Sequence, residues 1–451
     1  MATRKPPLRM VDWDWFLIFL LCSFLPIAVP TTIGATWEGR FFAAWKFLPP
    51  LCLAIGFVCI LWRIFRGPKA VALLALGWIF WTCVVILNHH HPETDAIVEY
   101  GRVTDLAFQH HGLWQGYLSG MTAYLFGYPP GSSLYVGWGR ALGQKNHNLA
   151  HTVVMLFWIL TWTANMTERT GRAMSAFLFS ALILFGEGLL WHYEYFYNNL
   201  MYSMVWSIFV IVPLWGSRLR PAQLLGYSLA LIWLRPQTSL AYIPILSYCL
   251  ICAFQGQRLV WVALTLVSCM AVTNIGEKVW TSRRASLETL GKQRRHEVYD
   301  EVAQGQTSQL LSIDLPPSSL APPPLPTKKF WKIGTEAVLW AARLIIKSYP
   351  LSCVLLLGGF IGFWCARARG SSWAGLAFLV PLLTPLGVNA GTFAFAFVFP
   401  DYQSIPSSLT RLLLSLPLIA AGLVVALDEQ LYQASRPASA TPTPAPTENS
   451  R

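Results

Sequence analysis

The apolar segments of this sequence set the narrowest limit on its fold. Stretches of nearly 20 residues rich in Leu, Ile, Val, Phe and Trp recur along the chain, and only 12% of its residues are charged. A helix of about 20 apolar residues crosses the hydrocarbon core of a bilayer, whereas soluble domains carry about 25% charged residues. We therefore predict an all-α polytopic membrane protein with about twelve transmembrane helices, which excludes a soluble enzyme. The predicted spans are roughly 11–31, 43–62, 70–88, 148–166, 173–191, 200–216, 222–234, 238–254, 258–274, 350–366, 372–398 and 407–427.

Basic residues in the short loops predict the orientation of these spans. Lys and Arg concentrate in cytoplasmic loops, and here they recur in every second connection. They are Arg4, Lys5, Arg9, Arg63, Arg66, Lys69, Arg169, Arg172, Arg218, Arg220, Arg258, Arg367 and Arg369. Both termini are then cytoplasmic, and the long polar segments 88–147 and 275–349 face outward. The formal charge of +12 points to anionic lipid or phosphate as a partner, not to nucleic acid.

The long polar segments divide the chain into parts with different compositions. Residues 278–304 mix basic and acidic side chains in a pattern typical of a helix, 312–327 are proline-rich, and 328–349 have apolar residues at helical spacing. The last pattern predicts an amphipathic helix on the membrane surface. The predicted parts are N-terminal transmembrane helices (1–87), an outer loop with amphipathic surface helices (88–147), a central transmembrane bundle (148–274), a basic and Pro-rich outer loop (275–349), C-terminal transmembrane helices (350–427) and a disordered cytoplasmic tail (428–451).

The outer loop 88–147 carries a resemblance to a known family. It holds most of the histidines, and it contains a recognisable series of acidic, small and proline residues. The series is Asp95-Ala96, Tyr100, Asp105-Leu106-Ala107, Gly112 and Tyr128-Pro129-Pro130-Gly131-Ser132. It resembles the GT-C superfamily of integral-membrane glycosyltransferases over about residues 80–165, and the rest of the chain is similar only in its multi-span outline, with a weaker similarity at 401–417. The resemblance implies a polyprenyl-phosphate-linked sugar donor, a cell-envelope glycan or lipid acceptor, and inverting transfer on the outer face of the membrane.

Asp95 is the residue that the resemblance indicates as the general base. A carboxylate a few residues beyond a span end can take a proton from an acceptor hydroxyl. The alternatives for Asp95 are a helix N-cap and an exposed loop acid. Glu93 is an alternative base or, as an E-x-D pair with Asp95, a metal ligand. No cofactor is required, but the sequence leaves a divalent metal possible.

Several neighbouring polar residues have both a functional and a structural interpretation. Asp105 and Arg102 either position the acceptor or donor or form a salt bridge with each other. The three consecutive histidines at 89–91 could suggest a metal site. However, three consecutive histidines on a helix cannot all ligate one ion. Polar anchoring at the membrane interface is therefore the simpler interpretation. Tyr128 is either part of a sugar-binding wall or an interfacial aromatic residue.

The leaving phosphate needs cations, and the sugar needs a polar and aromatic slot. Arg235, Arg294, Arg295 and Arg411 are the predicted phosphate-binding residues. Each can instead extend its guanidinium to the interface or bind anionic headgroups of the surrounding lipids. In the aromatic segment 191–199, Glu194 and Asn198 are the predicted partners of sugar hydroxyls, while an ordinary aromatic belt is the alternative for that segment.

Two other functions fit parts of the same pattern. An O-antigen-type polymerase or ligase also has many spans and a large basic outer loop. It would rely on arginines and a histidine of 275–349 and would not need Asp95. A polytopic lipid or sugar transporter would place ionisable residues at midspan, and few charges lie deep in the predicted spans. The leading hypothesis is a glycosyltransferase of the bacterial inner membrane whose active site faces the periplasm and whose surroundings are membrane lipids.

Overall fold

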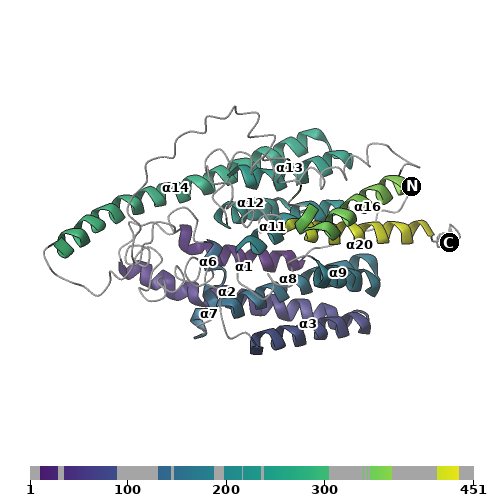
Figure 1. Ribbon diagram of the computed structural model, residues 1–451, viewed down its shortest axis with the longest axis horizontal. Coiled ribbons are helices and arrows are strands. Elements are labelled where there is room, and N and C mark those ends of the chain that lie inside the picture. Colours follow the sequence, from purple (N-terminus) through teal and green to yellow (C-terminus); the bar gives the residue numbers. More distant parts are fainter. Residues whose placement is uncertain are drawn as a thin grey trace, which may run out of the picture.

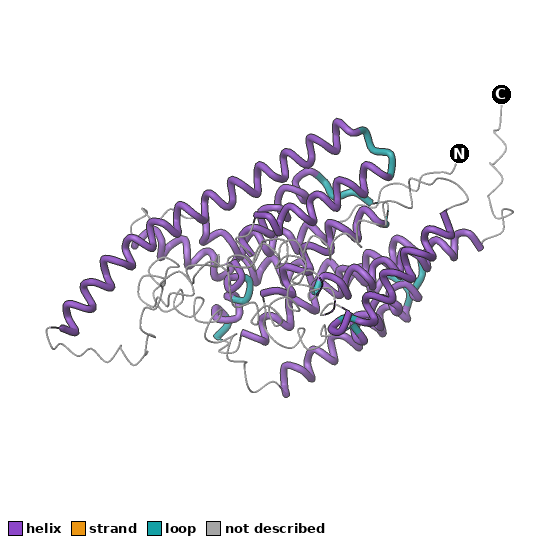
Figure 2. The backbone as a smooth tube through the Cα atoms, turned by 45° about the horizontal axis from the view of Figure 1, so that its top comes forward, coloured by secondary structure: helices purple, strands orange, loops and turns teal. Residues whose placement is uncertain are grey.

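The computed structural model of this chain consists of helices joined by short turns and loops, and the described residues contain no strand (Figure 1; Figure 2). The structure describes residues 11–28, 35–88, 131–143, 147–186, 198–215, 217–234, 238–303, 339, 343, 346–367 and 414–435. The all-α class predicted from the sequence is therefore confirmed for this part of the chain.

Helices overlap the predicted spans, except 372–398, which lies outside the described residues. The helices are α1 (Val11–Ala28), α2 (Ala35–Arg66), α3 (Lys69–Asn88), α6 (Gly131–Leu134), α7 (Gly137–Ala141), α8 (His147–Thr170), α9 (Ala173–Phe185), α11 (Asn198–Leu214), α12 (Pro221–Leu234), α13 (Thr238–Phe254), α14 (Leu259–Ala303), α16 (Pro350–Arg367) and α20 (Ser415–Ser435). The longer helices run side by side along the long axis of the molecule (Figure 1).

Among the described residues, four helices are long and apolar enough to cross a bilayer. They contain the segments Phe42–Arg66, Lys69–Leu87, Asn148–Thr170 and Leu259–Ser282. Other apolar helices, among them Leu200–Leu214 and Pro221–Leu234, are shorter, with 10–17 residues. Length and composition thus indicate a membrane protein.

The distribution of exposed apolar side chains agrees with a lipid environment. Only 33%, 28% and 17% of the apolar windows of α2, α3 and α14 are buried, against 89% for α8. Large apolar residues such as Val58, Leu73, Phe80 and Val267 are more than half exposed. Water would penalise such faces, because burying apolar surface is the main gain in folding, whereas lipid tails solvate them at no cost. Helices α2, α3 and α14 therefore form the surroundings of a core centred on α8 and α11.

Ion pairs join helix ends that the sequence predicts to be cytoplasmic. Arg63 at the end of α2 pairs with Glu168 near the end of α8. Arg172 pairs with Asp428 of α20 at 3.0 Å, and Arg220 before α12 pairs with Asp14 of α1 at 3.2 Å. A hydrogen bond from Arg169 to Ser217, 2.5 Å long, links two of these connections. We call this end of the bundle the charged end. The sequence pattern predicts that every second connection, each rich in Lys and Arg, lies at one end of the bundle. The contacts confirm this for these helices.

Helix α14 continues through the point where the sequence predicts a change from span to loop. The predicted span ends at residue 274 and the predicted outer segment begins at 275, but the helix runs unbroken for 45 residues. The helix predicted for 278–304 is confirmed as far as Ala303. The sequence did not indicate that this helix continues directly from the span. The last part of α14 projects beyond the other labelled helices (Figure 1).

Glycines allow several helix pairs to approach closely, as is common between membrane helices. A methyl group on Gly422 of α20 would lie 2.6 Å from the Ile211 side chain of α11. A methyl group on Gly56, Gly226 or Gly276 would likewise lie 2.6–2.9 Å from a side chain of α8, α1 or α12, respectively. Gly77 of α3, by contrast, has nothing within 4 Å of an added methyl group.

We expect Gly422→Ala to destabilise the protein by about 1–3 kcal/mol, because the methyl group overpacks the α11–α20 contact. The matched variant Gly77→Ala should be neutral or slightly stabilising, since alanine favours the helix and meets no neighbour there. Thermal unfolding of both variants in one detergent measures the difference. Equal unfolding temperatures for the two variants would contradict the packing of α20 on α11.

Candidate functional site

The end of the bundle opposite the charged end is built around the contact between Gly131 and Trp233. Gly131 is the first residue of α6, and its Cα lies so close to the Trp233 carbonyl of α12 that any side chain would overlap it. The Trp233 indole N–H donates to the Gly276 carbonyl of α14 at 3.3 Å, and its ring meets Phe24 of α1 edge-on with centroids 6.3 Å apart. Helices α1, α6, α12 and α14 thus meet here, and we call this the Trp233 end.

A buried tyrosine–histidine pair lies at the same end. Tyr135 follows α6, and its hydroxyl oxygen lies 2.8 Å from Nδ1 of His151 on α8. Both residues are fully buried. An ionisable side chain in a membrane interior is costly and marks a functional site by default. The neutral phenol is a suitable partner because it can either donate to Nδ1 or accept from it.

His151 belongs to a short polar stripe on α8. Asn148, His151 and Thr152 are spaced i, i+3 and i+4, which places them on one face of the helix. All three are buried, and the Thr152 hydroxyl donates to the Asn148 carbonyl at 2.8 Å. Helix α7 packs on α8 at this point. The start of α8 therefore presents amide, imidazole and hydroxyl groups where the rest of the predicted span is mostly apolar.

Most of the site residues predicted from the sequence lie outside the described residues. These are Glu93, Asp95, Arg102, Asp105, Tyr128, Glu194, Arg235 and Arg411. For Asn198, Arg294 and Arg295 the structure describes the backbone only. Asn198 is the first residue of α11, and the two arginines lie in the last third of α14. The roles of all these residues stay predictions.

The contact between Gly131 and Trp233 joins two described segments that are neighbours, in the sequence, of predicted site residues. Tyr128 precedes Gly131 by three residues, and Arg235 follows Trp233 by two. Gly131 and Trp233 touch, so the described segments next to these two positions lie at the same end of the molecule.

Helix α20 runs parallel to α11. Gly422 of α20 packs against Ile211 of α11, and the Trp215 indole donates to the Gly422 carbonyl at 3.1 Å. Asp428 of α20 lies at the charged end, as does Ser217 after α11, so the two helices run in the same direction. The start of α20 at Ser415 therefore lies on the Trp233 side of the Gly422 contact.

The two arginines of α14 lie further out. Gly276 marks the level of Trp233 on this helix, and Arg294 follows it by 18 residues, or about 27 Å along the axis at 1.5 Å per residue. The backbone of Arg294 and Arg295 therefore lies beyond the Trp233 end, further along α14.

The described residues contain no group of three or more His, Cys, Asp or Glu side chains that could hold a metal ion. The predicted ligands Glu93 and Asp95 lie outside this set. Comparison with protein-family models, with curated proteins and with solved structures finds no match to this chain.

Sequence reasoning overlooked Tyr135, Asn148 and His151. The available signal was the position of His151 three residues inside a predicted apolar span, in register with Asn148 and Thr152. The histidines at 89–91 drew attention because they are consecutive. A single histidine at helical spacing from other polar residues in a span is the more informative pattern.

We expect Tyr135→Phe and His151→Phe each to destabilise the protein by about 1–3 kcal/mol, because each leaves a buried polar partner without this hydrogen bond. The double variant should lose about 0.5–1.5 kcal/mol less than the sum, since the shared bond is lost only once. Unfolding in detergent of the four proteins of the cycle gives the coupling. The control is a cycle of Tyr135→Phe with Ser228→Ala, because the Ser228 hydroxyl donates to the Leu224 carbonyl of its own helix. This control cycle should be additive. Equal coupling in both cycles would contradict the Tyr135–His151 pair.

Proposed function

We propose that this chain is a multi-pass glycosyltransferase of a bacterial inner membrane, with about twelve spans and an active site facing the periplasm. It transfers a hexose or pentose from a polyprenyl phosphate to a glycan or lipid of the cell envelope, with inversion. The observation that carries the proposal is the contact between Gly131 and Trp233. It joins the segment after the Tyr128-Pro129-Pro130 turn, on which the family resemblance rests, to the segment before Arg235.

Three features of the described residues support this function. Apolar faces of α2, α3 and α14 are exposed as lipid would require. The Trp233 end contains a buried ionisable residue, His151, with a neutral partner. The positive-inside pattern assigns the opposite, charged end to the cytoplasm, so the Trp233 end is the outer one. A donor carried by a membrane lipid can reach such an end without leaving the bilayer.

The proposed reaction is a displacement at the anomeric carbon of the donor sugar. Asp95 takes the proton from the acceptor hydroxyl, and the resulting oxygen nucleophile attacks from the face opposite the phosphate. The bond between the sugar carbon and the phosphate oxygen breaks, and polyprenyl phosphate leaves with the electron pair. Arg235 and Arg411 compensate the charge that develops on the phosphate. One displacement gives one inversion, as the resemblance implies.

One observation favours a second function, the O-antigen-type polymerase or ligase. Helix α14 is unbroken to Ala303 and carries a basic segment, with Arg294 and Arg295, about 27 Å beyond the Trp233 level. In this alternative the arginines and a histidine of the long outer segment carry the reaction, and Asp95 has no chemical role. The two functions therefore predict different sensitive residues.

We expect Asp95→Asn to abolish sugar transfer while leaving folding unchanged, because the amide cannot accept the acceptor's proton. Transfer is measured with radiolabelled polyprenyl-phosphate hexoses and pentoses on membranes that contain the envelope acceptors. Asp14→Asn is the control, since Asp14 forms an ion pair at the charged end. Full activity of Asp95→Asn together with loss of activity in Arg294→Ala/Arg295→Ala would favour the polymerase or ligase instead.

The orientation gives a separate prediction. In a cysteine-free background, Leu142→Cys after α7 should react with an impermeant maleimide on spheroplasts, because it lies near the predicted outer start of α8 and is 63% exposed. Arg218→Cys, between α11 and α12, should react only after the membrane is opened. The opposite labelling pattern would place the Trp233 end in the cytoplasm and exclude a periplasmic active site.

A further inference from the structure

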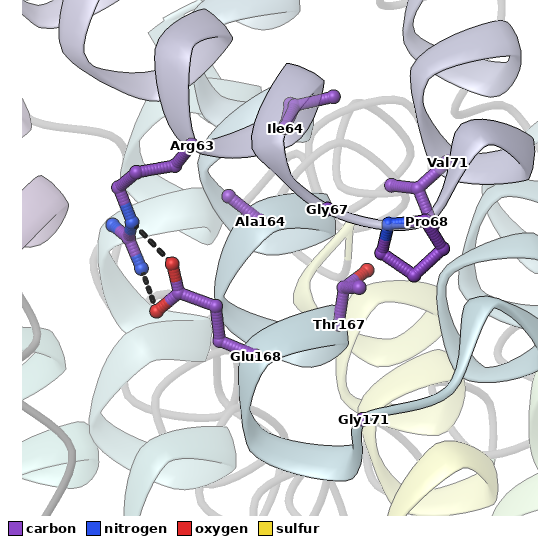
Figure 3. Close-up of a pocket in the computed structure, with 9 residues that line it drawn as sticks. All are labelled: Arg63, Ile64, Gly67, Pro68, Val71, Ala164, Thr167, Glu168 and Gly171. Atoms are coloured by element: carbon purple, nitrogen blue, oxygen red, sulfur yellow. Dashed lines mark hydrogen bonds and ion pairs between the residues drawn. The ribbon is translucent and has the colours of Figure 1, made fainter.

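A small pocket lies at the charged end, away from the Trp233 end. It is formed by the turn between α2 and α3 and by the last turns of α8, and its volume is about 200 Å³. Figure 3 shows the Arg63–Glu168 ion pair on one side of the pocket and Pro68 and Val71 on the other, with Ala164 and Thr167 between them. A volume of this size equals about six or seven water molecules at roughly 30 Å³ each, which is enough for a phosphate with a short polyol.

Two cations lie next to the lining of this pocket, and we call them the rim cations. Arg66 and Lys69 flank the Gly67–Pro68 turn, which lines the pocket. Both are exposed and have no ion-pair partner among the described residues. The guanidinium of Arg66 lies 4.0 Å from the centre of the Trp62 ring, one helical turn earlier on α2. Because Glu168 already compensates Arg63, the two rim cations remain to attract an anion.

The outer walls next to the pocket are apolar and exposed. Trp62 and Phe65 of α2 are 59% and 51% exposed, and Leu73 of α3 is 68% exposed. Acyl chains lying along these faces would bring a lipid headgroup to the level of the α2–α3 turn. A soluble anion would gain nothing from these faces, so the surroundings favour a lipid over a free phosphate.

We propose that this pocket binds the phosphoglycerol headgroup of an anionic phospholipid. Arg66 and Lys69 hold the phosphate at the rim. The glycerol hydroxyls enter the pocket and donate to the Glu168 carboxylate and to the Thr167 oxygen, whose own proton is donated to the Thr163 carbonyl at 2.8 Å. A serine headgroup fits less well, because its carboxylate would face Glu168. The site is independent of the glycosyltransferase proposal.

Native mass spectrometry of the full-length protein tests this site. The protein is incubated with phosphatidylglycerol, phosphatidylserine or phosphatidylcholine at equal concentration, and retained lipid is counted. Phosphatidylglycerol should be retained about tenfold better than phosphatidylcholine, equivalent to about one charge-assisted hydrogen bond, and better than phosphatidylserine. Equal retention of all three lipids would overturn the proposal.

Two kinds of variant locate the binding. Ala164→Leu fills the pocket without changing charge, and its control Ala54→Leu adds the same group to an exposed position of α2. Arg66→Gln/Lys69→Gln removes the rim charge, and its control Arg258→Gln removes an exposed cation elsewhere. We expect the preference for phosphatidylglycerol to be lost in both pocket variants and kept in both controls. If Ala164→Leu fails to fold, lipid retention by Arg66→Gln/Lys69→Gln alone decides whether the pocket binds the headgroup.

Preserved selectivity in the rim variant would contradict the site. Competition with inorganic phosphate at millimolar concentration separates the two sources of the phosphate group. Displacement of phosphatidylglycerol by inorganic phosphate alone would show that the pocket selects a free anion and would overturn the lipid proposal, whereas retention of the lipid supports it.

Discussion

The cost of an unsatisfied polar group in hydrocarbon determines most of this structure. Lipid offers no hydrogen-bond partner, so backbone groups are satisfied within helices, and polar side chains inside the bundle need local partners. Helix α8 illustrates the solution. Its Thr161 and Thr163 hydroxyls donate to the carbonyls of Phe157 and Ile159, four residues earlier, at 2.8 and 2.9 Å. The most buried of the four membrane-length helices can therefore be rich in threonine without breaking the apolar core.

The same cost explains how charged groups are distributed. At the charged end, ion pairs connect residues that are far apart in sequence, such as Arg172 and Asp428. These pairs lie where water is close, so each contributes little to stability alone. Their structural effect is to fix which helix ends lie at the same level. Helices α1, α2, α8, α12 and α20 are aligned in this way, and the alignment in turn places the starts of α6 and α8 at the opposite end.

The sequence predicts the helices well because their cause is local. Apolar length and the periodic return of basic residues depend on each segment alone, and both patterns survive in the structure. The Gly131–Trp233 contact and the Tyr135–His151 bond could not be predicted, because each depends on how α6 and α7 fold back onto α12 and α8. The continuity of α14 was missed for a related reason. A change from apolar to charged residues near Gly276 marks where a helix leaves lipid, and it does not mark where the helix ends.

The two ends of the bundle differ in how their polar groups are satisfied. At the charged end, Arg63 and Arg172 already have carboxylate partners within the chain. At the Trp233 end, two of the partners are neutral groups, the phenol of Tyr135 and the carbonyl of Gly276. Asp95 and Arg235, the charges predicted to act there, lie outside the described residues. Under the proposed function, arginine binds the donor phosphate, so binding energy is spent where the sugar–phosphate bond breaks. Arginines such as Arg63 and Arg172, by contrast, spend theirs on holding helix ends together.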